Sequence, residues 1–269
     1  MKHAREGGPV RYRARVEYDG TEFAGFQAQP GRRTVQGELE RVLAYLSGGS
    51  AFRIKAAGRT DAGVHATGQV IAFTWHGGLS ASALGQAIGS LLPPDVAIGP
   101  LTRVALDFDP RRAATGRAYR YSIWTGPRKP LRNRYHYELD ERLDVEAMHA
   151  AAQHLVGRHD FSAFGRVQRT SIRTLHEIRV RRRGHLVTVD VAGDAFLRQM
   201  VRSIVAALIR IGMGRATAED LVGELHSPGR AFDGAIVPAH GLCLRRVAIG
   251  RGRRKTRSST DSKEARQGP

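Results

Sequence analysis

The residues best suited to chemistry lie in one glycine-punctuated stretch, Ala57 to Gly68. Glycine allows positive φ angles and close approach of a ligand to the backbone, and a loop of this kind between two strands is a common place for a functional side chain. If the segment is locally extended, residues two apart face the same way, so Arg59 and Asp61 project together. A guanidinium that close keeps a carboxylate ionised and oriented, as a carboxylate nucleophile requires. The same residues also fit a hairpin-like turn with a weak surface ion pair, and the pattern alone leaves both interpretations open.

The cysteine and histidine content argues against metal chemistry. Cys243 is the only cysteine, which excludes an intrachain disulfide, a cysteine-based zinc site and an iron–sulfur cluster. The sequence has no HExxH motif, and His149, His154 and His159 recur every five residues, which scatters them around a helix. We therefore predict that the protein has no metal site.

The chain is strongly basic. Its 269 residues include 43 Lys and Arg against 25 Asp and Glu, a formal net charge of +18, and most of the basic residues are arginine. An excess of this size predicts a polyanionic partner, with nucleic acid as the first candidate. Arginine suits bidentate contacts to phosphate. A GC-rich genome would also favour arginine over lysine, but it would not account for the excess of positive charge.

Hydrophobic periodicity predicts an α+β protein whose two halves each mix strands with helices. Strands are expected at 12–18, 52–56, 69–75, 96–98, 117–124, 175–180, 186–191 and 242–249, and helices at 35–46, 80–91, 144–155, 196–211 and 218–225. We predict an N-terminal half at 1–110 that carries the Asp61 loop and a C-terminal half at 111–250. The remaining 251–269 holds seven basic and two acidic residues and almost nothing apolar. We expect it to be a disordered basic tail, either solubilising or binding phosphate nonspecifically.

The chain shows no signal for a membrane or for export. No run approaches the roughly 18 apolar residues of a membrane span, and the first residues lack the apolar core of a signal peptide. These features predict a cytoplasmic protein without a membrane partner.

The motif from Gly58 to His65, Gly-Arg-Thr-Asp-Ala-Gly-Val-His, resembles the signature of the tRNA pseudouridine synthase A family, which modifies positions 38 to 40 of the anticodon stem-loop. Further matches follow in order along 12–249: Tyr18-Asp19-Gly20-Thr21 with Phe23, Gly25 and Gln27; Arg117-Ala118-Tyr119-Arg120-Tyr121; Asp160-Phe161-Ser162-Ala163-Phe164; Phe196 through Met200-Val201-Arg202 to Val205; and Pro238-Ala239 with Gly241-Leu242. One motif could match by chance, but an ordered series is specific.

The resemblance implies both a fold and a reaction. The fold would consist of two similar ferredoxin-like halves that share an extended antiparallel sheet, with a central basic cleft and Asp61 at its floor. The reaction would detach uracil from ribose at N1 and reattach it at C5, with Asp61 as the nucleophile on either the ring or the sugar. Nothing is oxidised, hydrolysed or donated, so no cofactor is expected. The partner would be tRNA, whose uridine must be flipped out of its stack, and the family works as a homodimer.

The resemblance also suggests roles for three further residues. Arg59 would pair with Asp61 and hold the flipped nucleotide, and Tyr119 would stack on the uracil or act as a base for the C5 proton. Periodicity alone would instead place Tyr119 in the core with Tyr121 and Ile123. Arg202 would pair with Asp61, whereas helical periodicity alone turns it away from the apolar stripe, on the side of Arg198, and predicts that it is solvated.

Two other kinds of protein fit part of the pattern. A noncatalytic RNA-binding protein would keep the basic surface but would not need an Arg-Thr-Asp loop. A hydrolytic glycosidase acting on nucleic acid would normally use two carboxylates, and the sequence offers no obvious second carboxylate near Asp61.

Overall fold

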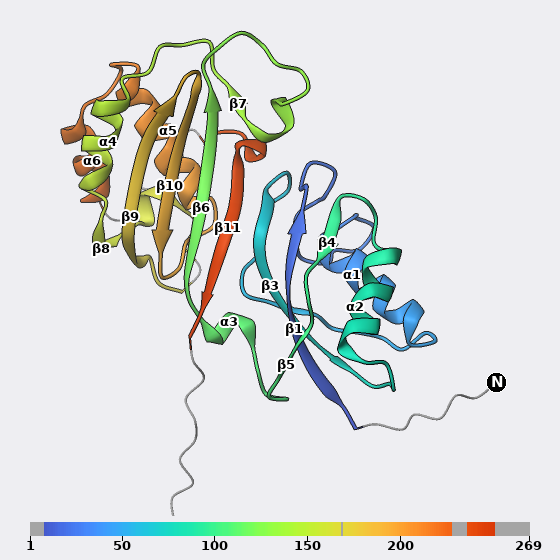
Figure 1. Ribbon diagram of the computed structural model, residues 1–269. Helices are drawn as coiled ribbons and strands as arrows, with labels where there is room; N and C mark the ends of the chain where they lie inside the picture. The colour runs from blue at the N-terminus through green and yellow to red at the C-terminus, as the bar shows by residue number, and fades with distance from the viewer. Residues whose placement is uncertain (1–7, 168, 228–235, 251–269) are drawn as a thin grey trace, which may run out of the picture.

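The computed structural model describes residues 8–167, 169–227 and 236–250, and within these ranges it shows an α+β fold built on one 11-stranded sheet. The strand order is β4-β1-β3-β11-β6-β10-β9-β8, with β2 and β5 paired beside β3 and β1 and with β7 beside β6. Figure 1 shows the two halves side by side, joined where β11 and β3 meet. The predicted fold class is confirmed. The predicted tail at 251–269 lies outside the described residues.

The N-terminal half has a ferredoxin-like order of elements. Its strands are β1 (Val10–Tyr18), β2 (Lys55–Ala56), β3 (His65–Trp75), β4 (Val96–Ile98) and β5 (Thr102–Val104), and its helices are α1 (Val35–Leu46), α2 (Ala81–Leu91) and α3 (Pro110–Ala113). The sequence β1-α1-β2-β3-α2-β4 gives the spatial order β4-β1-β3-β2. The Thr34 and Ser80 side chains cap α1 and α2, as a hydroxyl before an apolar periodic run predicts.

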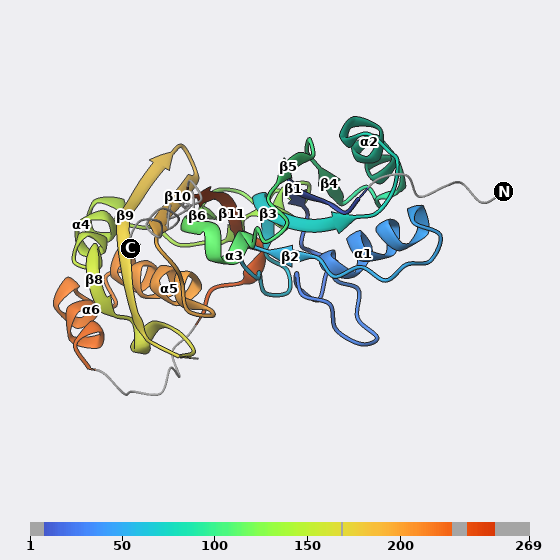
Figure 2. The same ribbon diagram turned by 90° about the horizontal axis from the view of Figure 1, so that it is seen from below.

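The C-terminal half repeats that arrangement. Its elements are β6 (Ala114–Trp124), η1 (Asn133–Tyr135), β7 (Tyr137–Glu138), α4 (Val145–Gln153), β8 (Gly157–Asp160), η2 (Ser162–Phe164), β9 (Ile172–Arg183), β10 (Leu186–Gly193), α5 (Met200–Gly212), α6 (Ala218–Leu225), η3 (Ala239–Gly241) and β11 (Leu242–Ile249). The spatial order β11-β6-β10-β9 corresponds to β4-β1-β3-β2 of the first half. In Figure 2, α5 of one half and α1 of the other lie on the same side of the strands.

The last strand joins the halves. β11 pairs antiparallel with β6 over most of its length and parallel with β3 at Cys243↔His65 and Leu244↔Ala66. The sheet is therefore antiparallel within each half apart from the short β6–β7 pair, but parallel at the junction. This junction lies at the start of β3, immediately after the loop that carries Asp61. The loop is thus positioned where both halves can contact it.

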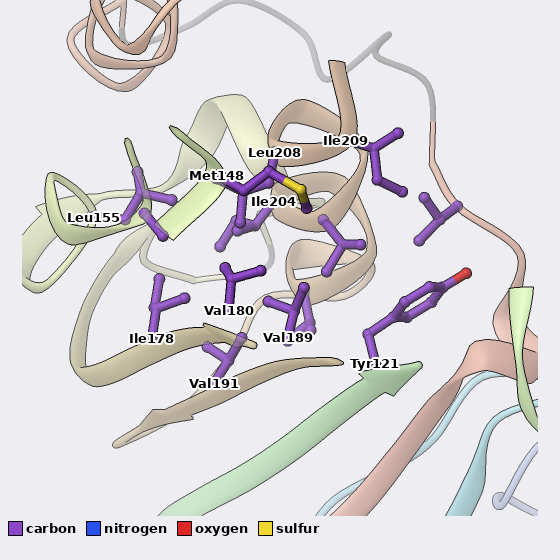
Figure 3. Close-up of a cluster of buried hydrophobic side chains, with 14 of the residues drawn as sticks. Tyr121, Met148, Leu155, Ile178, Val180, Val189, Val191, Ile204, Leu208 and Ile209 are labelled. Atoms are coloured by element: carbon purple, nitrogen blue, oxygen red, sulfur yellow. The ribbon is translucent and has the colours of Figure 1, made fainter. Parts of the chain in front are cut away.

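Each half has its own hydrophobic core. In the C-terminal half, strand residues such as Ile178 and Val189 pack against Ile204 and Leu208 of α5, and Met148 of α4 closes the cluster (Figure 3). The side chains of Val189, Ile204 and Leu208 are fully buried, so each contributes roughly 2 to 3 kcal/mol through removal of apolar surface from water. These cores fix the strands from which the site residues project.

Several predicted boundaries were wrong, and three of them lie near the Asp61 loop. β3 begins at His65, four residues before the predicted start, so the glycine-punctuated loop is shorter than expected. β2 spans two residues instead of five. The helix expected from Phe196 begins at Met200, because Gln199 has a left-handed φ of 69° and breaks the helical path. Residues 194–199 therefore form an irregular segment between β10 and α5, here called the pre-α5 segment.

Candidate active site

The Asp61 loop, residues 57–64, is held by the segment that follows β1. Thr60 is buried, its hydroxyl is 2.8 Å from the Tyr18 hydroxyl, and its carbonyl accepts from the Phe26 amide at 3.1 Å. A turn then closes the loop, because the Val64 amide donates to the Asp61 carbonyl at 3.2 Å. These bonds fix the backbone on both sides of Asp61.

Two glycines allow this close packing. A Cβ on Gly20 would collide with the Val64 carbonyl at the end of the loop. Gly25 has a φ of +101°, and a Cβ there would come within 2.9 Å of the Thr60 carbonyl. The glycines matched in the sequence between Tyr18 and Gln27 are therefore part of the support for Asp61.

The Asp61 carboxylate is half-buried and paired with an arginine from the other half. Its Oδ1 lies 3.3 Å from Nε of Arg198 in the pre-α5 segment, and the side chains are 27% and 57% exposed, respectively. The sequence suggested Arg59 and Arg202 for this pairing. Arg59 is exposed, and in the described part of the chain no ion pair joins it to Asp61. The pairing predicted between Arg59 and Asp61 is therefore not formed.

Arg202 has a different partner. Its Nε donates to the Val237 carbonyl at 2.7 Å, and the side chain is half-buried on α5. The predicted pairing of Arg202 with Asp61 is thus not seen, and the solvated position expected from periodicity alone is wrong as well. Arg198 takes the place beside Asp61 because it precedes the helix, where the Arg166 amide binds its carbonyl at 3.1 Å. The sequence did contain a signal for this residue, because helical periodicity placed Arg198 on the same side of the predicted helix as Arg202.

Tyr119 lies on β6 beside the same loop. It is half-buried, and its ring packs edge-on against Phe196 of the pre-α5 segment, with centroids 5.1 Å apart. Burial raises the pKa of Tyr119 to about 12; the cation of Arg117 opposes this shift and the charge of Asp61 adds to it. Tyr119 and Asp61 are thus near enough to interact electrostatically, and the phenol is protonated at neutral pH.

The family model described as tRNA pseudouridine synthase matches residues 14–111 and 151–248. A protein named tRNA pseudouridine synthase A from Geobacter sulfurreducens is 40% identical over 236 residues, covering 86% of this chain and 96% of its own. Another of that name, from Myxococcus xanthus, is 42% identical over 242 residues, covering 88% and 91%.

The chain belongs to the tRNA pseudouridine synthase family. It is therefore an isomerase that converts uridine to pseudouridine.

Two other matched motifs of this pseudouridine synthase pack within the C-terminal half and against the Asp61 loop. Tyr121 is fully buried, as its alternation on β6 predicts, and its hydroxyl donates to the Pro238 carbonyl at 2.8 Å. η3 follows Pro238, and Ala239 in it packs against Gly63 of the Asp61 loop. The Pro-Ala motif near the end of the chain therefore supports the Asp61 loop from the C-terminal half.

A cavity of about 480 Å³ lies elsewhere in the synthase. It is lined by residues including Thr67, Arg120, Tyr135 and Cys243, and not by Asp61 or Tyr119. Because Arg120 alternates with Tyr119 along β6, this cavity opens on the opposite face of the sheet. It is separate from the Asp61 site.

The described ranges contain no cluster of three or more His, Cys, Asp or Glu side chains that could hold a metal ion. The absence of a cofactor stays a prediction. In the same ranges, no helix is long and apolar enough to cross a membrane.

Proposed function

We propose that this pseudouridine synthase isomerises uridines 38, 39 and 40 in the anticodon stem-loop of tRNA, with Asp61 as the nucleophile. The observation that supports the assignment most directly is the half-buried Asp61 carboxylate, which is paired with Arg198 at 3.3 Å. An arginine at this distance can orient a carboxylate, and a carboxylate nucleophile must be aimed at the atom it attacks. The loop bonds described above hold the carboxylate in place before substrate arrives.

The chemistry is an isomerisation with no net exchange of atoms. The bond from uracil N1 to ribose C1′ breaks, the base turns, and a bond from C5 to C1′ forms. N1 gains a proton and C5 loses one, so proton transfer balances within the reaction. Asp61 can serve either by adding to the ring or by holding C1′ of the sugar. On the sugar, its oxygen is displaced as the C5–C1′ bond forms; on the ring, it is expelled after that bond has formed, as C5 loses its proton. No oxidant, reductant or group donor is needed.

We assign Tyr119 to the uracil base. Its ring is held by Phe196, which fixes a flat surface beside Asp61. Stacking on an aromatic side chain contributes about 1 to 3 kcal/mol per base, which offsets part of the cost of flipping the nucleotide. With a pKa raised to about 12, the phenol is protonated at neutral pH, so it can donate a hydrogen bond but is not available as a base. Abstraction of the C5 proton by Tyr119 would require its ionisation during the reaction.

The arginines around Asp61 divide into two groups in this proposal. Arg198 orients the carboxylate, because it is the residue paired with it. Arg59 is exposed next to Asp61 and is free to hold the flipped nucleotide. Arg202 binds substrate from α5, where its fixed Nε leaves the rest of the guanidinium available. The family resemblance adds a homodimer and a cytoplasmic location to the proposal, and both are predictions.

The test uses purified full-length protein and an unmodified tRNA transcript with uridine at 38, 39 and 40. Pseudouridine is mapped by carbodiimide modification and primer extension, with and without EDTA. We expect modification at these positions and no loss with EDTA. Asp61→Asn should abolish product while binding of tRNA persists. Full activity of Asp61→Asn would refute the nucleophile, and pseudouridine only outside 38–40 would refute the proposed target.

The same reaction mixtures separate the alternative functions. A noncatalytic RNA-binding protein would retain the transcript and form no pseudouridine. A hydrolytic glycosidase would release free uracil and leave an abasic ribose. Either result would contradict the proposal.

A further inference from the structure

Arg117 on β6 is a half-buried arginine that binds the backbone of both halves. One terminal nitrogen donates to the Ala57 carbonyl at 2.8 Å and the other donates to the Asp194 carbonyl at 2.7 Å. These partners lie 60 and 77 residues away in the sequence. A planar guanidinium with two fixed donors is suited to such a bridge.

The two carbonyls belong to the two segments that form the site. Ala57 is buried at the first position of the Asp61 loop, and its amide is held by the Val70 carbonyl at 2.8 Å. Asp194 opens the pre-α5 segment, and its amide is held by the Thr174 carbonyl at 3.0 Å. Arg117 therefore connects two backbone positions that are already fixed within their own halves.

The charge of Arg117 has no carboxylate partner in the described chain, where its side-chain hydrogen bonds go to carbonyl oxygens. Burial lowers the pKa of Arg117, and the nearby Tyr119 and Asp194 oppose that shift. An arginine stays protonated at neutral pH even after such a shift. Two short hydrogen bonds to carbonyls thus compensate the cost of burying it.

We propose that Arg117 is a positioning residue, which sets the separation between the Asp61 loop and the pre-α5 segment. In this way it places Arg198 and Phe196 correctly around Asp61 and Tyr119. The only strand pairing between the halves in the described chain joins two residue pairs of β11 and β3. Arg117 adds a hydrogen-bonded connection at the start of the loop, which restricts rotation of one half against the other at this point. The inference rests on the proposed function, because it assumes that Asp61 reacts.

The first experiment compares Arg117→Lys with Arg117→Met, using Arg120→Met as the matched control. Lysine keeps the charge but cannot bridge both carbonyls, and methionine keeps much of the apolar stem. Arg120 lies three residues away, on the opposite face of β6, and its side chain forms an ion pair with Asp190. We measure kcat and KM for the tRNA transcript, together with the melting temperature of each variant.

We expect both Arg117 variants to lose about 100-fold in kcat, the size of effect that a displacement of about 1 Å produces in a catalytic site. The KM for tRNA should change little, and Arg120→Met should retain wild-type kcat. Wild-type kcat for Arg117→Lys would overturn the proposal, because charge alone would then suffice. An increase in KM with unchanged kcat would also overturn it, because Arg117 would then be an RNA contact.

A second measurement guards against simple loss of folding. In Arg117→Ala, millimolar guanidinium ion should restore part of the lost kcat by occupying the space between the two carbonyls, while methylammonium should not. Equal failure of both ions would overturn the positioning role. Asp61→Asn in the same assay distinguishes failure of the nucleophile assignment from failure of the positioning role of Arg117. If Asp61→Asn is active, the nucleophile assignment fails, whereas the effect of Arg117 on kcat can still be measured.

Discussion

The identity of the arginine that orients Asp61 can be decided by comparing Arg198→Gln with Arg202→Gln. The pair between Asp61 and Arg198 joins atoms 3.3 Å apart, and the arginine side chain is 57% exposed. Two unit charges near this distance attract by about 1 kcal/mol in water-like surroundings, and exposed ion pairs contribute about 0 to 1 kcal/mol of stability. Arg198→Gln should therefore lower the melting temperature by less than about 4 °C.

The effect of Arg198→Gln on catalysis should be larger than its effect on stability. Loss of orientation of a reacting group costs up to about 100-fold in rate for a displacement of about 1 Å. We expect kcat to fall by about 10-fold or more, with little change in the KM for tRNA. Steady-state kinetics on the transcript and a thermal melt of the same sample provide both values.

Arg202→Gln should show the opposite pattern. It removes the 2.7 Å hydrogen bond to the Val237 carbonyl, and a charged hydrogen bond of this kind contributes about 1.5 to 3 kcal/mol. The melting temperature should fall by several degrees, and KM should rise if the rest of the guanidinium binds RNA. If Arg202→Gln loses kcat at unchanged melting temperature and KM while Arg198→Gln behaves as wild type, the reasoning from the observed ion pair is refuted.

Three other predictions follow from the site and the termini. Because burial raises the pKa of Tyr119 to about 12, this residue should stabilise the protein fully below pH 10, where the unfolded tyrosine is also protonated, and lose that contribution between pH 10 and 12. Urea titrations of wild type and Tyr119→Phe should diverge only in this range, and parallel curves would contradict the shift. Gly25→Ala should destabilise the folded protein by about 1 kcal/mol or more, because φ is +101° and the added Cβ would lie 2.9 Å from the Thr60 carbonyl oxygen. Activity should fall as well, and an unchanged urea midpoint would contradict this prediction. Truncation after Ile249 removes the basic residues of 251–269 and should weaken RNA binding and reduce its salt dependence; unchanged binding at low salt would leave the tail only a solubilising role.

Local patterns were sufficient for several elements. The bounds predicted for α1, α6 and β11 are those observed, because caps such as Thr34 and Thr217 and apolar periodicity are properties of neighbouring residues. The start of α5 could not be predicted in the same way. Apolar periodicity begins at Leu197, but Gln199 is left-handed and the residues before it are held by contacts with the Arg166 loop and with Arg117. Tertiary contacts there override the helical preference.

The sequence by itself determined the family and singled out the Asp61 loop, because both depend on short motifs that can be read residue by residue. Why Gly20 and Gly25 stand in those motifs became clear only from the structure, where each packs against the backbone of the loop. Only the tertiary structure decided which arginine meets Asp61. Arg198 is 137 residues away in the chain and belongs to the other half. Whether its side chain can contact Asp61 depends on how β11 joins the halves and on the break in the helical path at Gln199. Arg117 shows the same dependence, since its two carbonyl partners become neighbours only when both halves are assembled on one sheet.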